Sequence, residues 1–332
     1  MSTKDAIAPR QLGSTGPMVF PLALGCSGMS GSYGATSDDE SIATIHAAID
    51  RGITLLDTAD FYGYGHNEML IGRALKDRRD KALLSVKFGA LRAPDRSWLG
   101  VDGRAAAVKN FVAYSLKRLG VDCIDIYRLA RLDPNVPIEE TIGAIAELVK
   151  AGYVRQIGLS EVGVDTIRRA HAIHPICDLQ IEYSLISRAP ETAIFPLLTE
   201  LGIGVTAYGV LSHGLLSGSI STTPNDLRAH LPRFRGKNLV QNQLLVAQLD
   251  RIATQKGVSA TQIAIAWVLA KGKNIVPLIG ARKLTHLLES LAALEIDFSP
   301  AELAQIEELI KPSAIAGTRY DENLIKMLDS EK

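Results

Sequence analysis

Eight short runs of aliphatic and β-branched residues recur along the chain, and each is followed by a stretch whose apolar residues repeat with helical spacing. Successive parallel strands need a crossover helix between them, and eight such strand–helix units can close into a barrel. This pattern predicts an α/β fold of the (β/α)8 TIM-barrel type. The predicted strands are residues 19–25, 53–57, 82–88, 124–129, 154–160, 178–183, 204–208 and 274–279.

The predicted helices follow these strands. They are residues 38–50, 67–76, 104–119, 139–150, 165–172, 191–201, 241–255, 261–270, 284–294 and 300–309. A long polar insert at 211–238 precedes the helices of the seventh unit, and 300–309 is an additional C-terminal helix. An open, doubly wound sheet is the rival fold. It favours a GxGxxG turn after the first strand, but residues 25–31 match that motif only in part and no helix is predicted to begin there.

The 332 residues contain no obvious linker, so the chain is predicted to form one domain, 1–332, with its core at about 10–310. The 36 basic and 36 acidic side chains balance, which gives no electrostatic reason to expect a nucleic-acid or membrane-surface partner. No apolar run approaches the ~20 residues that span a bilayer. Cys26, Cys123 and Cys177 are few and far apart, which predicts a reduced, cytoplasmic protein with no metal site.

Polar side chains gather at the predicted C-terminal ends of the strands, where barrels of this kind carry their active sites. The second strand is followed by Asp57, Asp60 and Tyr62, and the third strand carries Lys87. The later strands contribute Arg131, Ser160, Glu161, Gln180, Glu182, Tyr208 and Arg282.

Seven short sequence blocks fall in register with the predicted strands. They are DTADFYGYGHNE at 57–68, SVKFG at 85–89, KRLGVDCIDIY at 117–127, GYVRQIGLSE at 152–161, QIEYS at 180–184, AYGVL at 207–211 and IVPLIGARK at 275–283. Taken together and in this order, they make the chain resemble the aldo-keto reductase family between Arg10 and Leu309. The resemblance implies reduction of an aldehyde or ketone to an alcohol by hydride transfer from NADPH.

Tyr62, Lys87 and Asp57 have the chemistry that this reaction needs. Hydride transfer to a carbonyl carbon leaves an alkoxide that must receive a proton. A phenol with a pKa of about 10 is a weak acid unless a nearby cation stabilises its phenolate. We therefore predict Tyr62 as the general acid, Lys87 as the cation beside it, and Asp57 as the anchor of that ammonium. From the residues alone, a loop tyrosine beside a structural Asp57–Lys87 ion pair is an open alternative, and the resemblance favours catalysis.

The fourth strand departs from the family pattern. Most members carry a histidine that binds the substrate carbonyl, and the segment IDIYRLARLDP places Ala130 at that position. A small residue there resembles the branch that includes pyridoxal reductases, which implies a pyridoxal-like aromatic aldehyde as substrate. Impaired catalysis is the alternative. Strand alternation puts Arg128 on the same side as Ala130, so Arg128 is either a substrate contact or part of an interior ion pair, for instance with Glu182. His66 is expected to border the pocket.

The resemblance also implies where the cofactor binds. Ser160 and Gln180 would hydrogen-bond the nicotinamide carboxamide, and Tyr208 would stack on the ring. Arg282 would pair with the 2′-phosphate, which favours NADPH over NADH. The tip at Pro232–Phe234 would close over the cofactor as a lid. The predicted cofactor contacts are Gly25, Ser27, Asp57, Ser160, Gln180, Tyr208, Leu211, Gly214, Gly218, Gly280, Arg282, His286, Glu289 and Ser290.

Two other functions compete with that of a reductase acting on a small carbonyl compound. The first is a nicotinamide-binding regulatory or partner-binding subunit with weak or no turnover. Ala130 favours it, whereas intact Asp57, Tyr62 and Lys87 disfavour it. The second is an aldolase-type barrel in which Lys87 forms a Schiff base, and Arg282 argues against it. The sequence predicts no particular oligomeric state.

Overall fold

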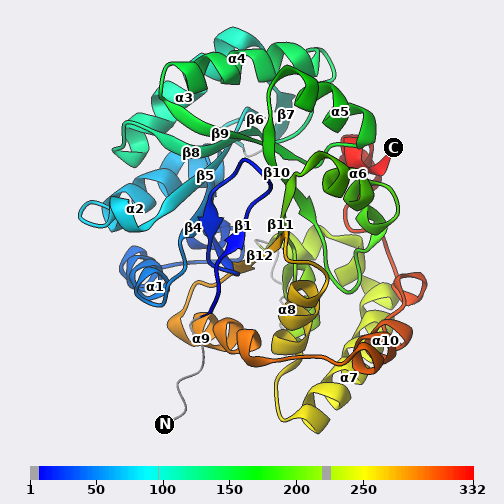
Figure 1. Cartoon of the computed structure of the whole chain (residues 1–332). Coiled ribbons are helices and arrows are strands. Elements are labelled where there is room, and N and C mark those ends of the chain that lie inside the picture. The colour runs from blue at the N-terminus through cyan, green and yellow to red at the C-terminus, as the bar shows by residue number, and fades with distance from the viewer. Residues whose placement is uncertain (1–6, 96, 219–225) are drawn as a thin grey trace.

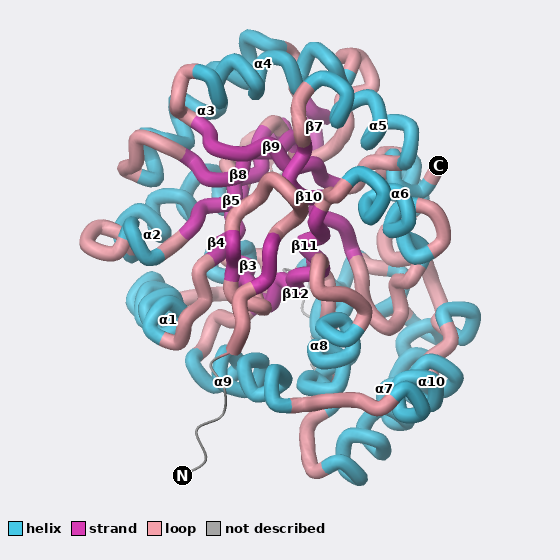
Figure 2. The backbone as a smooth tube through the Cα atoms, in the orientation of Figure 1, coloured by secondary structure: helices cyan, strands magenta, loops and turns pink. Residues whose placement is uncertain are grey.

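Eight parallel strands close into a barrel in the computed structural model, which describes residues 7–95, 97–218 and 226–332. Each strand pairs with the next, and the last pairs with the first, as Figures 1 and 2 show. The predicted (β/α)8 barrel is therefore confirmed. The barrel strands are β3 (Ala23–Gly25), β4 (Leu55–Ala59), β5 (Leu83–Phe88), β8 (Ile124–Leu129), β9 (Val154–Ser160), β10 (Ile176–Glu182), β11 (Gly204–Tyr208) and β12 (Ile275–Gly280).

Helices surround the barrel on its outer side (Figure 1). One helix packs outside the barrel after each strand: α1 (Asp38–Asp50), α2 (His66–Ala74), α3 (Ala105–Leu119), α4 (Ile138–Lys150), α5 (Val164–Ile173), α6 (Ile194–Leu201), α8 (Ala260–Ala270) and α9 (Leu284–Ala292). Three further helices lie outside this repeat: α7 (Gly236–Lys256), α10 (Pro300–Leu309) and α11 (Glu322–Lys326). The additional C-terminal helix predicted at 300–309 is α10.

Local sequence signals explain where several helices begin and end. Ser259 and Gln262 form a reciprocal capping box at the start of α8, and Ser299 and Glu302 do the same for α10. Gly120 follows α3 in the left-handed conformation, with φ of 67°, which glycine adopts without a steric penalty. Because such signals are local, the sequence predicts these boundaries well.

A short hairpin closes the bottom of the barrel and corrects the first predicted strand. The sequence predicts one strand over 19–25, but these residues divide between β2 (Met18–Val19) and β3, and β2 pairs with β1 (Arg10–Gln11). Pro21 lies at the break, where its missing N–H cannot donate to a sheet ladder. Leu12 and Val19 are fully buried and pack against the lower interior side chains of the barrel.

A second hairpin follows β5 and was not predicted. It is formed by β6 (Ala90–Arg92) and β7 (Trp98–Val101), which pair antiparallel before α3 begins. Because it follows the C-terminal end of a barrel strand, it stands on the side where the site residues gather. The guanidinium of Arg92 lies 4.9 Å from the centre of the Trp98 ring.

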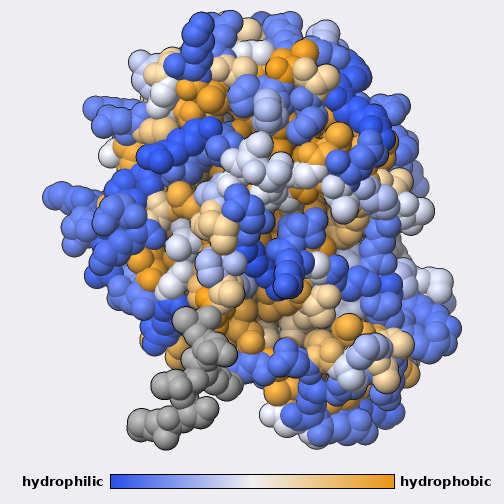
Figure 3. All heavy atoms as spheres, viewed as in Figure 1, coloured by the Kyte–Doolittle hydropathy of each residue, from blue (hydrophilic) through white to orange (hydrophobic). Residues whose placement is uncertain are grey.

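The outer surface is mixed in character. Figure 3 shows hydrophilic residues over much of the face that it views, with smaller apolar groups between them. Within the described residues, no helix combines the length and the apolar character that crossing a bilayer requires.

A buried ion pair occupies the middle of the barrel interior. Arg128 from β8 lies 3.0 Å from Asp178 of β10, and both side chains are fully buried. Asp178 also accepts a hydrogen bond from Thr206 at 2.5 Å, and Arg128 donates one to Ser85 at 3.2 Å. The interior ion pair expected as one alternative for Arg128 is therefore confirmed, but its partner is Asp178 and not the suggested Glu182, which lies further along β10.

Gly158 of β9 makes room for this ion pair, and replacing it tests the packing. A Cβ at Gly158 would lie 2.6 Å from Asp178 Oδ1 and 2.9 Å from Arg128 Nε. We predict that Gly158→Ala lowers the free energy of unfolding by about 1–3 kcal/mol, the usual cost of overpacking. Denaturant unfolding measures this change.

Gly143→Ala is the matched control. Gly143 lies within α4, and a Cβ there meets nothing within 4 Å. The added methyl group should stabilise the helix by about 0.5–1 kcal/mol. Equal unfolding midpoints for the two variants would contradict the role assigned to Gly158.

Candidate active site

Asp57, Lys87 and Tyr62 come together at the C-terminal end of two neighbouring strands. β4 and β5 are in register, so that Ala59 lies opposite Lys87. The Lys87 ammonium forms an ion pair with Asp57 Oδ1, and these residues are 4% and 2% exposed. Tyr62 begins the short helix η2 (Tyr62–Gly65) directly after β4, and its ring centre lies 5.2 Å from Lys87 Nζ. The three predicted catalytic residues therefore form one cluster.

The surroundings of Tyr62 keep its hydroxyl protonated. Burial raises the pKa of Tyr62 above its ordinary value, and the negative charge of Asp57 raises this pKa further. The positive charge of Arg131 and a hydrogen bond with Ser27 act in the opposite direction. Burial likewise lowers the pKa of Lys87, while Asp57 favours its charged form. The raised pKa makes Tyr62 a weaker acid than a free phenol, so the transfer of its proton to a developing alkoxide depends on the Lys87 ammonium beside its ring to stabilise the phenolate.

Asp57 also connects this cluster to the opposite side of the barrel. Its second oxygen accepts hydrogen bonds from Ser85 at 2.8 Å and from the side-chain amide of Gln180 at 2.7 Å. Gln180 lies on β10 in register with Ser160 of β9. Because the Gln180 nitrogen is bound to Asp57, its oxygen is left as an acceptor, whereas the Ser160 hydroxyl can donate. This pair suits a primary carboxamide, which has one acceptor oxygen and an N–H2 donor.

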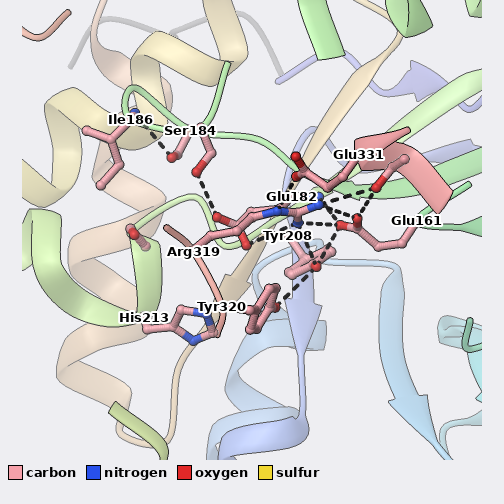
Figure 4. A network of polar contacts seen from close by, with 12 residues as sticks. Glu161, Glu182, Ser184, Ile186, Tyr208, His213, Arg319, Tyr320 and Glu331 are labelled. Carbon is pink, nitrogen blue, oxygen red and sulfur yellow. Dashed lines mark hydrogen bonds and ion pairs between the residues drawn. The ribbon is translucent and has the colours of Figure 1, made fainter. Parts of the chain in front are cut away.

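A network of buried charges lies beside this cluster (Figure 4). Glu161 is fully buried, and Arg319 donates to both of its carboxylate oxygens, at 2.9 and 2.6 Å. Tyr208 donates its hydroxyl to Glu161 at 2.7 Å, and the Tyr320 hydroxyl lies 3.3 Å from that of Tyr208. Arg319 also forms an ion pair with Glu331 at 2.7 Å. The Glu161 carboxylate therefore serves as the buried partner of Arg319.

The C-terminal segment is thereby attached to the open end of the barrel. In Figure 1 it is the red segment that passes from α10 towards α5 and α6. Asp329 accepts hydrogen bonds from Gly163 N at 2.9 Å and from Thr166 at 2.7 Å. Sequence reasoning missed Arg319 and Tyr320, because they lie in a non-periodic segment. The available signal was the pair of acidic residues at strand ends, Glu161 and Glu182, since buried carboxylates require cations.

The predicted lid is wrong. The Pro232–Phe234 segment forms the short helix η7, in which Arg233 and Phe234 are buried. Arg233 donates to Ser187 at 2.9 Å and to the Ile186 carbonyl at 3.2 Å, so the segment is packed into the body of the protein. Residues 219–225 of the predicted insert lie outside the described residues.

The other predicted loop residues surround the end of β11. Leu211 is partly buried against the core, and Gly214 and Gly218 have positive φ values of 92° and 67°. His213 directly precedes Gly214, and its Nδ1 forms a hydrogen bond of 2.9 Å with the hydroxyl of Tyr33. This contact joins the loop after β11 to the loop after β3, which follow the two strands that flank β12.

The predicted phosphate residues lie where β12 meets β3. Gly280 pairs with Gly25, and Gly280 is exposed with open space around its Cα. Arg282 is half-buried and donates to the backbone carbonyl of Tyr33 at 3.1 Å. Its hydrogen bonds within the described chain go to neutral carbonyls, so its charge is left for an anion. The last predicted contacts, His286, Glu289 and Ser290, lie on α9.

Two of the α9 residues are already bound within the protein. Glu289 accepts a hydrogen bond from Ser259 at 2.7 Å, and Ser290 donates to the His286 carbonyl at 2.9 Å. His286 itself is exposed. Ser27, near the first strand, lies 3.0 Å from Ser32 through their hydroxyl oxygens.

Arg128 and His66, which are sequence candidates for the substrate pocket, both form polar contacts with other side chains of the protein. Arg128 is fully buried and held by Asp178, as described above. His66 has both ring nitrogens engaged, with Ser30 at 2.9 Å and with Asp38 at 3.0 Å. Arg128 is therefore not available as a substrate contact, whereas the position of His66 at the border of the pocket stays a prediction. Among the described residues, no cluster of three histidine, cysteine or acidic side chains could hold a metal ion.

A parallel barrel that carries a tyrosine, a lysine and an aspartate at the C-terminal ends of adjacent strands has the groups of a carbonyl-reducing enzyme. The family model described as "Aldo/keto reductase family" matches residues 21–311. The chain therefore belongs to the aldo/keto reductase family.

Known proteins agree with this assignment. The "Probable aldo-keto reductase 1" of Glycine max is 41% identical over 326 residues, which cover 96% of this chain and 93% of the relative. The structure of a glycerol dehydrogenase from Gluconobacter oxydans superimposes with a TM-score of 0.83 at 28% identity, covering 92% and 97% of the two chains. An aldo-keto reductase from Klebsiella pneumoniae, solved in complex with NADPH, has a TM-score of 0.75 at 26% identity, with 95% and 99% covered.

The Glu161–Arg319 pair predicts a specific dependence of stability on pH. Hydrogen bonds and the charge of Arg319 outweigh burial and hold the pKa of Glu161 at about 2, below its ordinary value of 4.5. Ionised Glu161 therefore stabilises the fold above pH 4.5, and this contribution is lost as the pH falls from 4.5 towards 2. We predict that Glu161→Gln costs about 1.5–3 kcal/mol at neutral pH, because it removes the carboxylate that accepts two hydrogen bonds from Arg319, while Arg319 keeps its ion pair with Glu331.

The measurement is the difference in unfolding free energy between wild type and variant as a function of pH. This difference should shrink below pH 4.5. Glu200→Gln, which removes an exposed ion pair with Arg168, is the control and should change stability by less than about 1 kcal/mol. If the loss of unfolding free energy in Glu161→Gln stayed constant from neutral pH down to about pH 2, the assigned ion pair would be contradicted.

Proposed function

We propose that this protein is an NADPH-dependent carbonyl reductase in which Tyr62 donates the proton. The observation that carries the proposal is the protonated Tyr62 phenol beside the buried Lys87–Asp57 ion pair. The small carbonyl substrate would bind above this cluster. The three free cysteines, Cys26, Cys123 and Cys177, support a cytoplasmic location.

The residues present suit a dinucleotide with a 2′-phosphate. Among the described residues, the hydrogen bonds of the Arg282 guanidinium go to the neutral carbonyls of Tyr33 and Ala35, and a planar guanidinium matches a phosphate bidentately. The open backbone at Gly280 allows a ligand to approach closely. At the other end, Ser160 and Gln180 offer the donor and acceptor for a nicotinamide carboxamide. The NADPH complex of the Klebsiella relative supports this choice of cofactor.

The mechanism follows from the positions of these side chains. Bound NADPH supplies the hydride to the carbonyl carbon. Tyr62 donates its phenolic proton to the carbonyl oxygen as the carbon–oxygen π bond breaks. The ammonium of Lys87 stabilises the phenolate that remains, and Asp57 holds that ammonium in place with the help of Ser85 and Gln180. The half-buried Tyr208 would lie against the nicotinamide ring, held by its hydrogen bond to Glu161.

Ala130 supports an aromatic, ring-shaped substrate such as a pyridoxal-like aldehyde. Ala130 directly follows β8, and because its side chain is a single methyl group, this position offers little bulk and no polar side-chain atom. A site with a small residue at this point can accept a wider substrate than one with an imidazole.

Tyr62→Phe tests the proposed proton donor. We expect turnover of aldehydes, pyridoxal included, to fall by about 10²- to 10⁴-fold, the usual contribution of general acid catalysis, because phenylalanine has no proton to give. NADPH binding, followed by fluorescence titration, should be unchanged. Tyr64→Phe is the control, because Tyr64 is exposed and its hydroxyl donates to Ala93. Wild-type protein that binds NADPH but reduces no carbonyl would instead favour the regulatory subunit.

Arg282→Ala tests the cofactor preference. Hydrogen bonds to charged groups contribute about 1.5–3 kcal/mol, so we predict that NADPH binds roughly 10- to 100-fold more weakly to this variant. NADH affinity should stay within about twofold, because NADH lacks the 2′-phosphate. Titration of both dinucleotides makes the comparison, and an equal loss for both would argue against a 2′-phosphate contact.

A further inference from the structure

Arg131 is a cation at the barrel mouth that the proposed mechanism has not yet used. It follows β8 directly and is half-buried. One guanidinium nitrogen, Nη1, donates to the carbonyl oxygen of Ala130 at 2.7 Å and lies 3.5 Å from the hydroxyl of Ser160. The side chain therefore bends back over its own strand end, towards the adjacent end of β9.

The surroundings of Arg131 differ from those of the other arginines in this part of the barrel. Arg128 pairs with Asp178, Arg233 lies 3.5 Å from Glu182, and Arg319 pairs with Glu161. Within the part of the chain that the structure describes, no carboxylate forms an ion pair with Arg131. Against the effect of burial, the negative charge of Glu161 acts on Arg131 from beyond ion-pair distance and raises the pKa of its guanidinium. A guanidinium at the mouth of an active site that is not in an ion pair is suited to a ligand that carries or develops negative charge.

A continuous set of contacts leads from Arg131 to the proton donor. Ser160, beside Arg131, is in register with Gln180, which is bonded to Asp57. Asp57 holds Lys87, whose ammonium faces the Tyr62 ring. The charge of Arg131 also acts on Tyr62 itself, where it opposes the rise in pKa that burial causes. The charges of Arg131 and Lys87 therefore both lie near Tyr62.

We propose that Arg131 donates a hydrogen bond to the carbonyl oxygen of the substrate and stabilises the negative charge that develops there. This inference rests on the proposed carbonyl-reductase function and assigns a second donor to the same oxygen. Ala130 has no polar side-chain atom, and Arg128 is locked in the barrel interior by Asp178. Arg131 is thus the cation at this strand end that can reach a bound carbonyl.

The two donors, Arg131 and Tyr62, would have different chemical roles. A carbonyl carbon that received a hydride from bound NADPH, which would become NADP⁺, would pass its π electron pair to oxygen. Arg131 stabilises that charge without transferring a proton, because a guanidinium stays protonated in proteins. Tyr62 then supplies the proton, which gives the neutral alcohol and a phenolate beside Lys87. Fixed donors aimed at a developing oxyanion are an effective source of rate acceleration.

The test is the single-turnover rate of NADPH oxidation by Arg131→Met. Loss of one oxyanion donor typically costs about 10²- to 10³-fold, and we expect a loss of this size for two matched substrates, benzaldehyde and its para-carboxylated analogue. The affinity for NADPH, measured separately by fluorescence titration, should change by less than about threefold. Arg168→Met is the control, because Arg168 lies on the outer helix α5 in an exposed ion pair with Glu200, and this variant should react at the wild-type rate.

Chemical rescue distinguishes a donor from a packing residue. In Arg131→Ala, millimolar guanidinium should restore part of the lost rate, whereas equal concentrations of neutral urea should not. Thermal unfolding and circular dichroism of each variant show whether it is folded. Arg131→Lys provides a second variant that keeps the charge, and it should retain more of the rate than Arg131→Met.

Three outcomes would overturn the proposal. If Arg131→Met weakened only the binding of the carboxylated aldehyde and left both single-turnover rates intact, Arg131 would be an anchor for anionic substituents. A loss of NADPH affinity with an unchanged single-turnover rate would make it a cofactor contact. An unchanged rate and unchanged binding for both aldehydes would remove it from the site. Failure of the carbonyl-reductase function itself would look different, because wild-type protein would then oxidise NADPH with neither aldehyde.

Discussion

The ion pair between Asp57 and Lys87 is the interaction on which the site depends. It joins β4 to β5, and the second oxygen of Asp57 extends the connection to β10 through Gln180. A lone charge at this depth would be very unfavourable, but each partner supplies the other's counter-ion, and Ser85 satisfies a remaining lone pair. The position of the ammonium beside Tyr62 is therefore a consequence of how three strands are joined.

The same requirement for paired charges organises the rest of the open end of the barrel. Arg128 with Asp178 fills the interior below the site, and Gly158 leaves the space that they need. The ion pair of Arg319 with Glu161 attaches the C-terminal segment to the open end of the barrel. Glu161 also accepts a hydrogen bond from Tyr208, which would lie against the nicotinamide ring. Against this background, Arg131 and Arg282 differ from these arginines, because neither forms an ion pair with a carboxylate among the described residues. That contrast is why Arg131 is assigned a ligand rather than a structural role.

Much of the fold could be predicted because its signals are local. The strands predicted at 124–129, 154–160 and 204–208 have the same bounds in the structure, because aliphatic runs between polar turns define them without reference to distant residues. The two hairpins could not be predicted in this way, since strands of two to four residues carry too little pattern. The conformation of the C-terminal segment depends on partners such as Glu161 that lie far away in the chain.

The candidate site likewise has one part that local sequence signals predict and another that depends on distant residues. The sequence by itself determined the barrel, the family resemblance and the cluster of Asp57, Tyr62 and Lys87, because strand order and short motifs place these residues at neighbouring strand ends. Only the tertiary structure decided which buried charges neutralise one another. Arg319 meets Glu161 across 158 residues of chain, and Asp178 takes Arg128 out of the substrate site. Ion pairing inside a folded protein is set by distance in space, and sequence separation contains almost no information about it.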